Sequence, residues 1–438
     1  MRINRSVLKV LRYWDTVLVV VLEMTALLFL LNQEVPPPGR LSTQIDRLVA
    51  DKRFNFTAWE LQALWGKVTH ALIAPQRYMN EPARSELLLN YLNLVDEIRS
   101  TEWEIYRIYT DPKVEHPEVV AQEQLTRLAS LRQAEEARQL LAEAILEEQA
   151  GTILISEGFG ALRLLLPPVS IHFTPLPTLL VVSPRERIER IYSAELRHGL
   201  DASQREAIES EVDALQNVSS LVTDVGGLSS YPSMLLEDSS ILWLTDVTVH
   251  EWTHHYLLLR PLGWNYEASP ETRTINETVA SIVGHEAGRS ILARYYPAFL
   301  PDEQPENAPS EGEAGQHAKH AFDFRQEMHK TRVHVDALLA EGKITEAEDY
   351  MEQRRQEFVA HGYYIRKLNQ AYFAFHGAYA DEPGAAGEDP VGPAVKRLRA
   401  LIPDLHTFVV RVARVTRLSE LEALIKEMEQ EIQRGAAE

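Results

Sequence analysis

Residues 250–254 read His-Glu-Trp-Thr-His, and this short motif restricts the possible folds more than any other feature of the sequence. Two histidines four positions apart lie one turn from each other on an α-helix, about 40° apart, so both imidazoles can converge on one cation. The surrounding residues 241–259 are mostly apolar, which is typical of a buried helix. The motif therefore predicts a buried helix that presents two metal ligands.

A catalytic zinc ion usually takes three protein ligands and leaves one position open. We expect the third ligand on a second helix, over about residues 274–295, and Glu277 is its first candidate. Glu286 and His285 are the alternatives, although Glu286 lies about 180° round the helix from Glu277, so the two acids cannot serve one ion. Glu251, next to the first histidine, would lie beside the open position and accept a proton from water.

With 22 residues between the second histidine and Glu277, the segments HEWTH and NETVA together resemble the gluzincin metallopeptidases, the thermolysin-like class. The resemblance covers about residues 245–294. It implies that His250, His254 and Glu277 hold Zn²⁺ and that Glu251 is the general base in the hydrolysis of peptide bonds. It also implies a peptidase core with a small mixed sheet.

The resemblance assigns supporting roles as well. Asn276 matches a frequent family residue and is expected to help orient the site. The interval between the two motifs is longer than in the best-known branches. Ser281 stands where many members carry an aspartate that hydrogen-bonds a ligand histidine, so Asp246 and Glu286 become candidates for that hydrogen bond.

A late segment, LNQAYFAFHGAYADE, carries polar side chains at a spacing of three, four and three. Asn369, Tyr372, His376 and Tyr379 would form one stripe on a helix. One hypothesis is that His376, Tyr372 or Tyr379 stabilises the oxyanion that forms when water adds to a peptide carbonyl. The alternative is a set of buried aromatic residues that hydrogen-bond within a helical bundle.

The N-terminus begins with a basic segment followed by an apolar run over residues 17–31, interrupted by Glu23. We expect an uncleaved membrane anchor over residues 1–35, because no small-residue cleavage site follows the run. The basic residues before the run place the N-terminus in the cytoplasm and the catalytic domain outside it. A buried N-terminal helix or an interfacial helix is the alternative. The basic residues are Arg2, Arg5, Lys9 and Arg12.

Composition limits the remaining possibilities. The chain of 438 residues carries 44 Lys and Arg against 64 Asp and Glu, a net charge of −20. A phosphate backbone attracts basic clusters, so nucleic acid is not an expected partner. The absence of cysteine excludes disulfides and thiolate metal sites. The oligomeric state is left open.

Patterning predicts a mostly helical α+β protein with five parts. After the anchor we expect a helical domain over residues 36–150, and Trp59, Trp65, Trp103 and Tyr106 should lie in its core. A metallopeptidase core over residues 151–300 follows, with strands at residues 170–173 and 178–182 and a third strand broken by two adjacent glycines. A loop and helical hairpin occupy residues 301–362, and a helical block occupies residues 363–438.

Two functional hypotheses follow from these observations. The first is a membrane-anchored zinc metallopeptidase that acts on a peptide or protein substrate. The second is a zinc-fold protein with little or no turnover that serves as an anchored binding or assembly module. Glu251 favours the first hypothesis, because a chain that has lost catalysis tends to lose the base while keeping its core, and here the base is intact.

Overall fold

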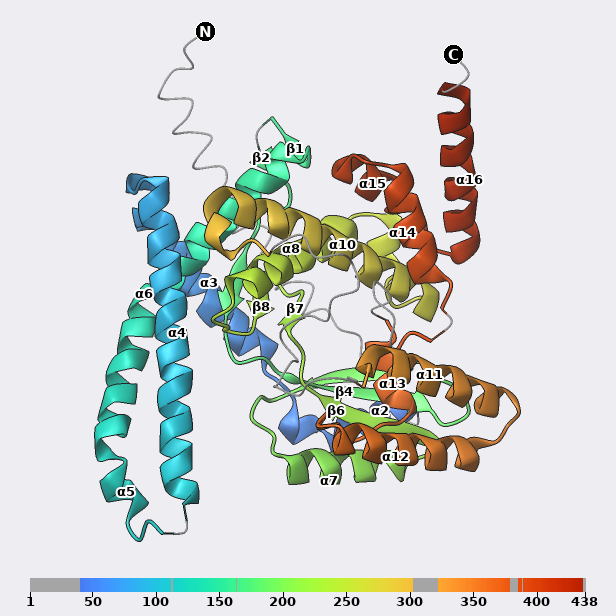
Figure 1. Cartoon of the computed structure of the whole chain (residues 1–438), viewed down its shortest axis with the longest axis horizontal. Coiled ribbons are helices and arrows are strands. Elements are labelled where there is room, and N and C mark those ends of the chain that lie inside the picture. The colour runs from blue at the N-terminus through green and yellow to red at the C-terminus, as the bar shows by residue number, and fades with distance from the viewer. Residues whose placement is uncertain are drawn as a thin grey trace.

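The structure is a computed structural model, and it describes residues 40–111, 113–162, 164–301, 322–378, 385–387 and 389–435. The chain is mostly helical with three small sheets, which confirms the predicted α+β class. Figure 1 shows a pair of long helices on one side of the molecule, a second pair in the upper part, and a sheet with its own helices in the lower part. The predicted domain boundaries remain a prediction.

The long pair consists of α4 (Glu81–Thr110) and α6 (Gln122–Ser156), connected through α5 (Pro117–Val120), and it forms an arm (Figure 1). Helix α4 begins after Asn80, whose side chain accepts a hydrogen bond from the Ala83 amide. The inner part of each helix is buried in the main core, as at Leu92 and Leu146.

The expectation that the tryptophans and tyrosine of this region are core residues is wrong at three positions. Trp65 is 72% exposed, Trp103 is 60% exposed and Tyr106 is 57% exposed. Trp103 and Tyr106 stack on each other with ring centroids 5.4 Å apart. The reason is that helical spacing identifies an apolar face, whereas burial also requires a neighbouring element to cover that face.

The remaining N-terminal elements pack beside the arm and the sheet. They are α2 (Leu41–Leu48), η1 (Ala50–Lys52), α3 (Phe56–Ile73) and η2 (Pro75–Tyr78).

An antiparallel sheet has β4 (Thr178–Pro184) at its centre, with β5 (Tyr192–Leu196) and β6 (Val218–Thr223) on its two sides. All of β4 is buried, and its centre is the apolar run over residues 179–182. Because side chains alternate along a strand, Leu180 and Val182 join the core under α2 and α7 (Ala202–Asp213), whereas Leu179 and Val181 pack with α13 (Gln370–His376).

A second sheet has a mixed arrangement. Strand β3 (Ile171–Phe173) runs parallel to β8 (Ser233–Leu235), and β8 pairs antiparallel with the short β7 (Gly227–Leu228). Strands β3 and β4 coincide with two predicted strands. The predicted third strand is interrupted between β6 and β7, where Gly226 lies, but Gly227 is itself the first residue of β7. The third sheet is a hairpin of β1 (Gly160–Ala161) and β2 (Leu164–Leu165).

The upper pair consists of α8 (Ile241–Leu258) and α10 (Pro270–Tyr295), which lie side by side and are joined through α9 (Pro261–Trp264) (Figure 1). Glycines make their close contact possible. A Cβ atom on Gly284 would lie 2.9 Å from the Asp246 carbonyl oxygen, and one on Gly288 would overlap the Asp246 carboxylate. Side chains at these two positions would separate the helices, so the glycines set the distance between them.

The C-terminal part is helical. The predicted hairpin is formed by α11 (Phe324–Ala340) and α12 (Ile344–Ala360), and the first of the three final helices packs beside α10. The elements not yet named are η3 (Pro297–Phe299), α14 (Val391–Leu401), α15 (Leu405–Val412) and α16 (Leu418–Gly435).

The prediction of a membrane anchor is corrected here. Within the described part of the chain, no helix combines the length and the apolar character needed to cross a bilayer. Residues 1–35, on which the anchor and the extracytoplasmic location depended, lie outside the described residues.

Candidate metal centre

Helices α8 and α10 bring three predicted ligands together. The His250 and His254 Nε2 atoms lie 3.1 Å apart. The Glu277 Oε2 atom lies 3.4 Å from the first and 3.5 Å from the second. Among the described residues, this is the one group of three or more His, Cys, Asp or Glu side chains that could hold a metal ion. We call these three residues the ligand group.

The separations of these atoms fit a tetrahedral metal ion. Zinc binds histidine nitrogen and carboxylate oxygen at about 2.0–2.2 Å, so ligand atoms of one tetrahedron lie roughly 3.3–3.5 Å apart. The Glu277 Oε2 atom is buried and has no hydrogen-bond partner among the described residues. A buried carboxylate oxygen without a partner is costly, and a cation between the three atoms would satisfy it.

Two hydrogen bonds hold the ligands in orientation. The His254 Nδ1 atom lies 2.7 Å from the Asn276 side-chain oxygen. An amide oxygen only accepts, so Nδ1 donates to it, and Nε2 is the nitrogen that faces Glu277 and can bind a metal. On the other side, the Tyr266 hydroxyl donates a hydrogen bond to Glu277 Oε1, which leaves Oε2 to face the histidines.

The electrostatics of the group favour positive charge at its centre. Burial disfavours a charged imidazole, but the Glu277 carboxylate outweighs burial and raises the pKa of His254 to about 9. Burial alone would raise the pKa of Glu277, but His254 and His250 hold it well below its usual range. The three ligands therefore attract a cation strongly in the absence of a metal.

Glu251 is buried beside the ligand group and is held by the segment that contains β7. The Ser229 hydroxyl donates a hydrogen bond to Glu251 Oε2. A Cβ atom on Gly227 would overlap Glu251 Oε1, so only glycine leaves room for this carboxylate. The His255 Nε2 atom, 2.9 Å from the Ser230 carbonyl oxygen, ties the same segment to α8. The carboxylate of Glu251 is therefore fixed in one position.

The alternative ligands and the expected supporting residues lie elsewhere. Glu286 forms a two-point ion pair with Arg399, with distances of 2.8 and 2.6 Å. His285 lies 2.7 Å from Asp246 Oδ2, so the Asp246 carboxylate contacts this exposed histidine. Ser281 is buried on α10, and no hydrogen bond of its hydroxyl occurs within the described residues. The predicted supporting roles of Ser281 and Asp246 remain predictions.

The predicted polar stripe lies on and after α13. Asn369 caps this helix, because its oxygen accepts a hydrogen bond from the Tyr372 amide, and its nitrogen donates to the Ser220 carbonyl of β6. The His376 ring lies 4.2 Å from the Tyr372 ring. Tyr379 lies outside the described residues. Asn369 therefore has a structural role, and the catalytic roles of the other three residues remain predictions.

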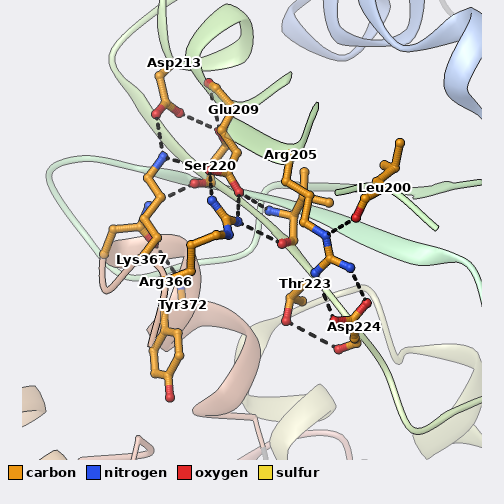
Figure 2. Close-up of polar contacts among 12 residues, drawn as sticks. Leu200, Arg205, Glu209, Asp213, Ser220, Thr223, Asp224, Arg366, Lys367 and Tyr372 are labelled. Atoms are coloured by element: carbon orange, nitrogen blue, oxygen red, sulfur yellow. Dashed lines mark hydrogen bonds and ion pairs between the residues drawn. The ribbon is translucent and has the colours of Figure 1, made fainter. Parts of the chain in front are cut away.

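Figure 2 shows how α13 is tied to the sheet. Next to it, Arg366 forms an ion pair with Glu209, and the Lys367 Nζ atom lies 3.0 Å from Asp213. The Tyr372 ring points away from these ion pairs in the same view. Burial lowers the pKa of His376 to about 4, so this imidazole is neutral at pH 7 and could assist an oxyanion only as an N–H donor.

Sequence patterns did not identify three residues that support the site. Tyr266 lies in the connection between α9 and α10, and Gly227 and Ser229 lie on or after β7. The pair of adjacent glycines is a signal that was present, because glycine in a strand often marks a close approach of another group. No comparable signal marks Tyr266.

Comparisons with models of protein families, with curated proteins and with solved structures find no match for this chain.

Proposed function

We propose that this protein is a zinc-dependent metallopeptidase that hydrolyses peptide bonds with Glu251 as general base. One observation supports the proposal above all others. The two Nε2 atoms and the Glu277 Oε2 atom converge at tetrahedral spacing, and a buried glutamate, the neighbour of the first ligand, lies beside them. This donor set, with two histidines and one carboxylate, is typical of catalytic rather than structural zinc sites.

Zinc, Glu251 and the residues that hold Glu251 would each have a separate role in hydrolysis. Bound zinc would supply Lewis acidity that makes water a nucleophile near neutral pH and polarises the peptide carbonyl. Glu251 would accept the proton from the attacking water and deliver it to the nitrogen of the leaving amine. The hydrogen bond from Ser229 and the position of Gly227 would hold the carboxylate where this transfer is possible.

Glu251→Gln in the full-length protein tests the proposal. We expect the wild type and this variant to bind one zinc ion each by elemental analysis, because Glu251 is not a ligand. In a peptide-library digestion followed by mass spectrometry, we expect cleavage by the wild type and a roughly 10²- to 10⁴-fold lower rate for the variant. Glu286→Gln is the matched control, since it alters another acidic residue of α10 that pairs with Arg399 away from the ligand group, and it should retain both zinc and cleavage.

The remaining outcomes distinguish the alternatives. Zinc in both proteins with cleavage by neither would contradict the peptidase proposal and favour the non-catalytic binding module. Zinc loss in Glu286→Gln but not in Glu277→Gln would contradict the assignment of the third ligand.

A further inference from the structure

Two arginines, Arg190 and Arg273, lie beside the ring of Tyr266. The Arg190 and Arg273 Cζ atoms lie 5.8 and 5.7 Å from the centre of the Tyr266 ring, and the hydroxyl of this ring contacts Glu277. Arg273 lies one helical turn before Glu277 on α10, and Arg190 comes from the loop before β5. The two guanidinium groups therefore lie close to the ligand group.

Both arginines are nearly inaccessible to solvent. The Arg190 side chain is 10% exposed and the Arg273 side chain is 5% exposed. Their Nε atoms are buried and have no hydrogen-bond partner among the residues described. Charged side chains are seldom buried unless their donors are satisfied. The two Nε–H groups are therefore free to donate hydrogen bonds to a ligand.

One exposed carboxylate joins the two arginines. Glu267 Oε1 lies 2.6 Å from Arg190 Nη2, and Oε2 lies 2.5 Å from Arg273 Nη2, while 66% of the Glu267 side chain is exposed. The chain thus holds a carboxylate between two guanidinium groups at the edge of the ligand group. Arginine pairs well with carboxylates because its planar fork matches their two oxygens.

We propose that Arg190 and Arg273 form a binding site for a carboxylate of the substrate, and that Glu267 occupies this site until substrate displaces it. The inference rests on the proposed peptidase function, and it specifies the substrate class as peptides with a carboxylate close to the scissile bond. That carboxylate belongs either to the C-terminus of the peptide or to an acidic side chain. Because Glu267 is mostly exposed, it can leave without unfolding the elements around it.

Binding of small peptides, measured by isothermal titration calorimetry on the zinc-loaded full-length protein with Glu251→Gln in every sample so that no probe is cleaved, tests the inference without turnover. The probes are N-acetyl-Gly-Phe with a free carboxylate, its C-terminal amide, and N-acetyl-Gly-Glu-amide. We expect this parent protein to bind at least one carboxylate probe roughly tenfold or more tightly than the neutral amide. The better of the two carboxylate probes identifies the source of the carboxylate.

Four variants sharpen the test. Arg190→Met and Arg273→Met should bind the carboxylate probes as weakly as the amide, whereas Arg289→Met, on the exposed face of α10, should bind all probes as the parent protein does. Glu267→Gln should bind the carboxylate probes several-fold more tightly, because the competing charge is gone. Zinc content and thermal unfolding identify any variant that fails to fold, and Arg273→Lys then replaces Arg273→Met, with a partial loss expected.

Equal binding of all three probes by the parent protein would overturn the inference, as would unchanged probe preference in both folded arginine variants or in Glu267→Gln. Failure of the peptidase proposal gives a different result. In that case the peptide library stays uncleaved, while the preference for carboxylate probes and its loss in the arginine variants persist.

Discussion

Two buried clusters of histidine and glutamate occur in the described part of the chain, and they differ in whether a cationic side chain lies against their carboxylates. In the first, which we call the lysine cluster, the Lys67 Nζ atom lies 2.7 Å from Glu143 Oε2 and 2.7 Å from Glu147 Oε1. His172 completes it, with Nδ1 3.0 Å from Glu143 Oε1. The second is the ligand group on α8 and α10.

The lysine cluster contains its own cation, and the ligand group does not. Backbone amides contribute to the first cluster, since Phe173 donates to Glu143 and Ile171 donates to Glu147. Glu143 Oε2 and Glu277 Oε2 both lack a hydrogen-bond partner among the described residues, but the Lys67 ammonium lies 2.7 Å from the first. The second faces only the two histidine nitrogens, at 3.4 and 3.5 Å. The comparison shows that residue types alone do not identify a metal site. What identifies it is an unsatisfied centre toward which the donor atoms converge.

The largest effect is expected when the lysine cluster loses its cation. Lys67→Met would leave two carboxylates buried without their counter-charge, so we expect the free energy of unfolding to fall by about 3–5 kcal/mol in urea titrations. The control is Lys52→Met, which removes a surface ion pair with Asp51 and should cost about 0–1 kcal/mol. Equal losses in the two variants would mean that Lys67 does not hold the cluster together.

Zinc should bind at the ligand group and not at the lysine cluster, and its binding should stabilise the folded protein. At a free zinc concentration of 100 times the Kd, we expect the free energy of unfolding to rise by about 2.7 kcal/mol, and a chelator should remove the gain. His254→Gln should abolish this gain, measured by thermal unfolding with and without zinc. His172→Gln, the matching change in the lysine cluster, should retain it. A gain that survives in His254→Gln would place the metal elsewhere.

The hydroxyl of Tyr266 should adjust the affinity of the ligand group. Tyr266→Phe removes the hydrogen bond to Glu277 Oε1 and keeps the ring, so we expect zinc affinity to fall 10- to 100-fold, about 1.4–2.7 kcal/mol, in competition titrations with a chelating dye. Tyr256→Phe is a suitable control, because Tyr256 lies on α8 itself and its ring packs against Arg260 rather than Glu277. Unchanged affinity would contradict the orienting role of Tyr266.

The smallest effect concerns pH. Burial would raise the pKa of Glu143, but Lys67 and His172 outweigh it and hold the pKa at about 2. In the wild type the stability from Glu143 is therefore fully present above pH 4.5 and is lost only as the pH falls toward 2. Without Lys67 burial dominates, the pKa rises above its unfolded value, and lowering the pH should restore stability.

We accordingly expect the destabilisation in Lys67→Met to shrink by about 1–2 kcal/mol between pH 7 and pH 5, measured from urea midpoints. The wild type serves as the reference at each pH. A deficit that grows on acidification would have the opposite sign and would contradict this account of the cluster.

Much of the ligand group could be predicted because helices make spacing informative. His250 and His254 had to share a face once their segment was helical, and Glu277 was the acid on the buried side of the next helix. The same reasoning correctly separated Glu286 from Glu277, and the structure pairs Glu286 with Arg399 instead.

The rest depends on contacts that no local pattern encodes. Tyr266 and Ser229 reach the site from connecting segments, whose paths are set by how the helices and strands pack. The predicted burial of Trp65 and Trp103 is wrong for a related reason, because it depends on whether a distant part of the chain covers these side chains. Sequence periodicity therefore predicts faces well and tertiary neighbours poorly.

The contact between α8 and α10 has a consequence for the choice of ion. Gly284 and Gly288 bring the two helix backbones together without intervening side chains, so the span from the paired imidazoles to the carboxylate is fixed by main-chain packing. A rigid span of this kind selects by ionic size as well as by chemistry, and larger ions such as calcium, which need longer bonds and more oxygen atoms, would be poorly accommodated.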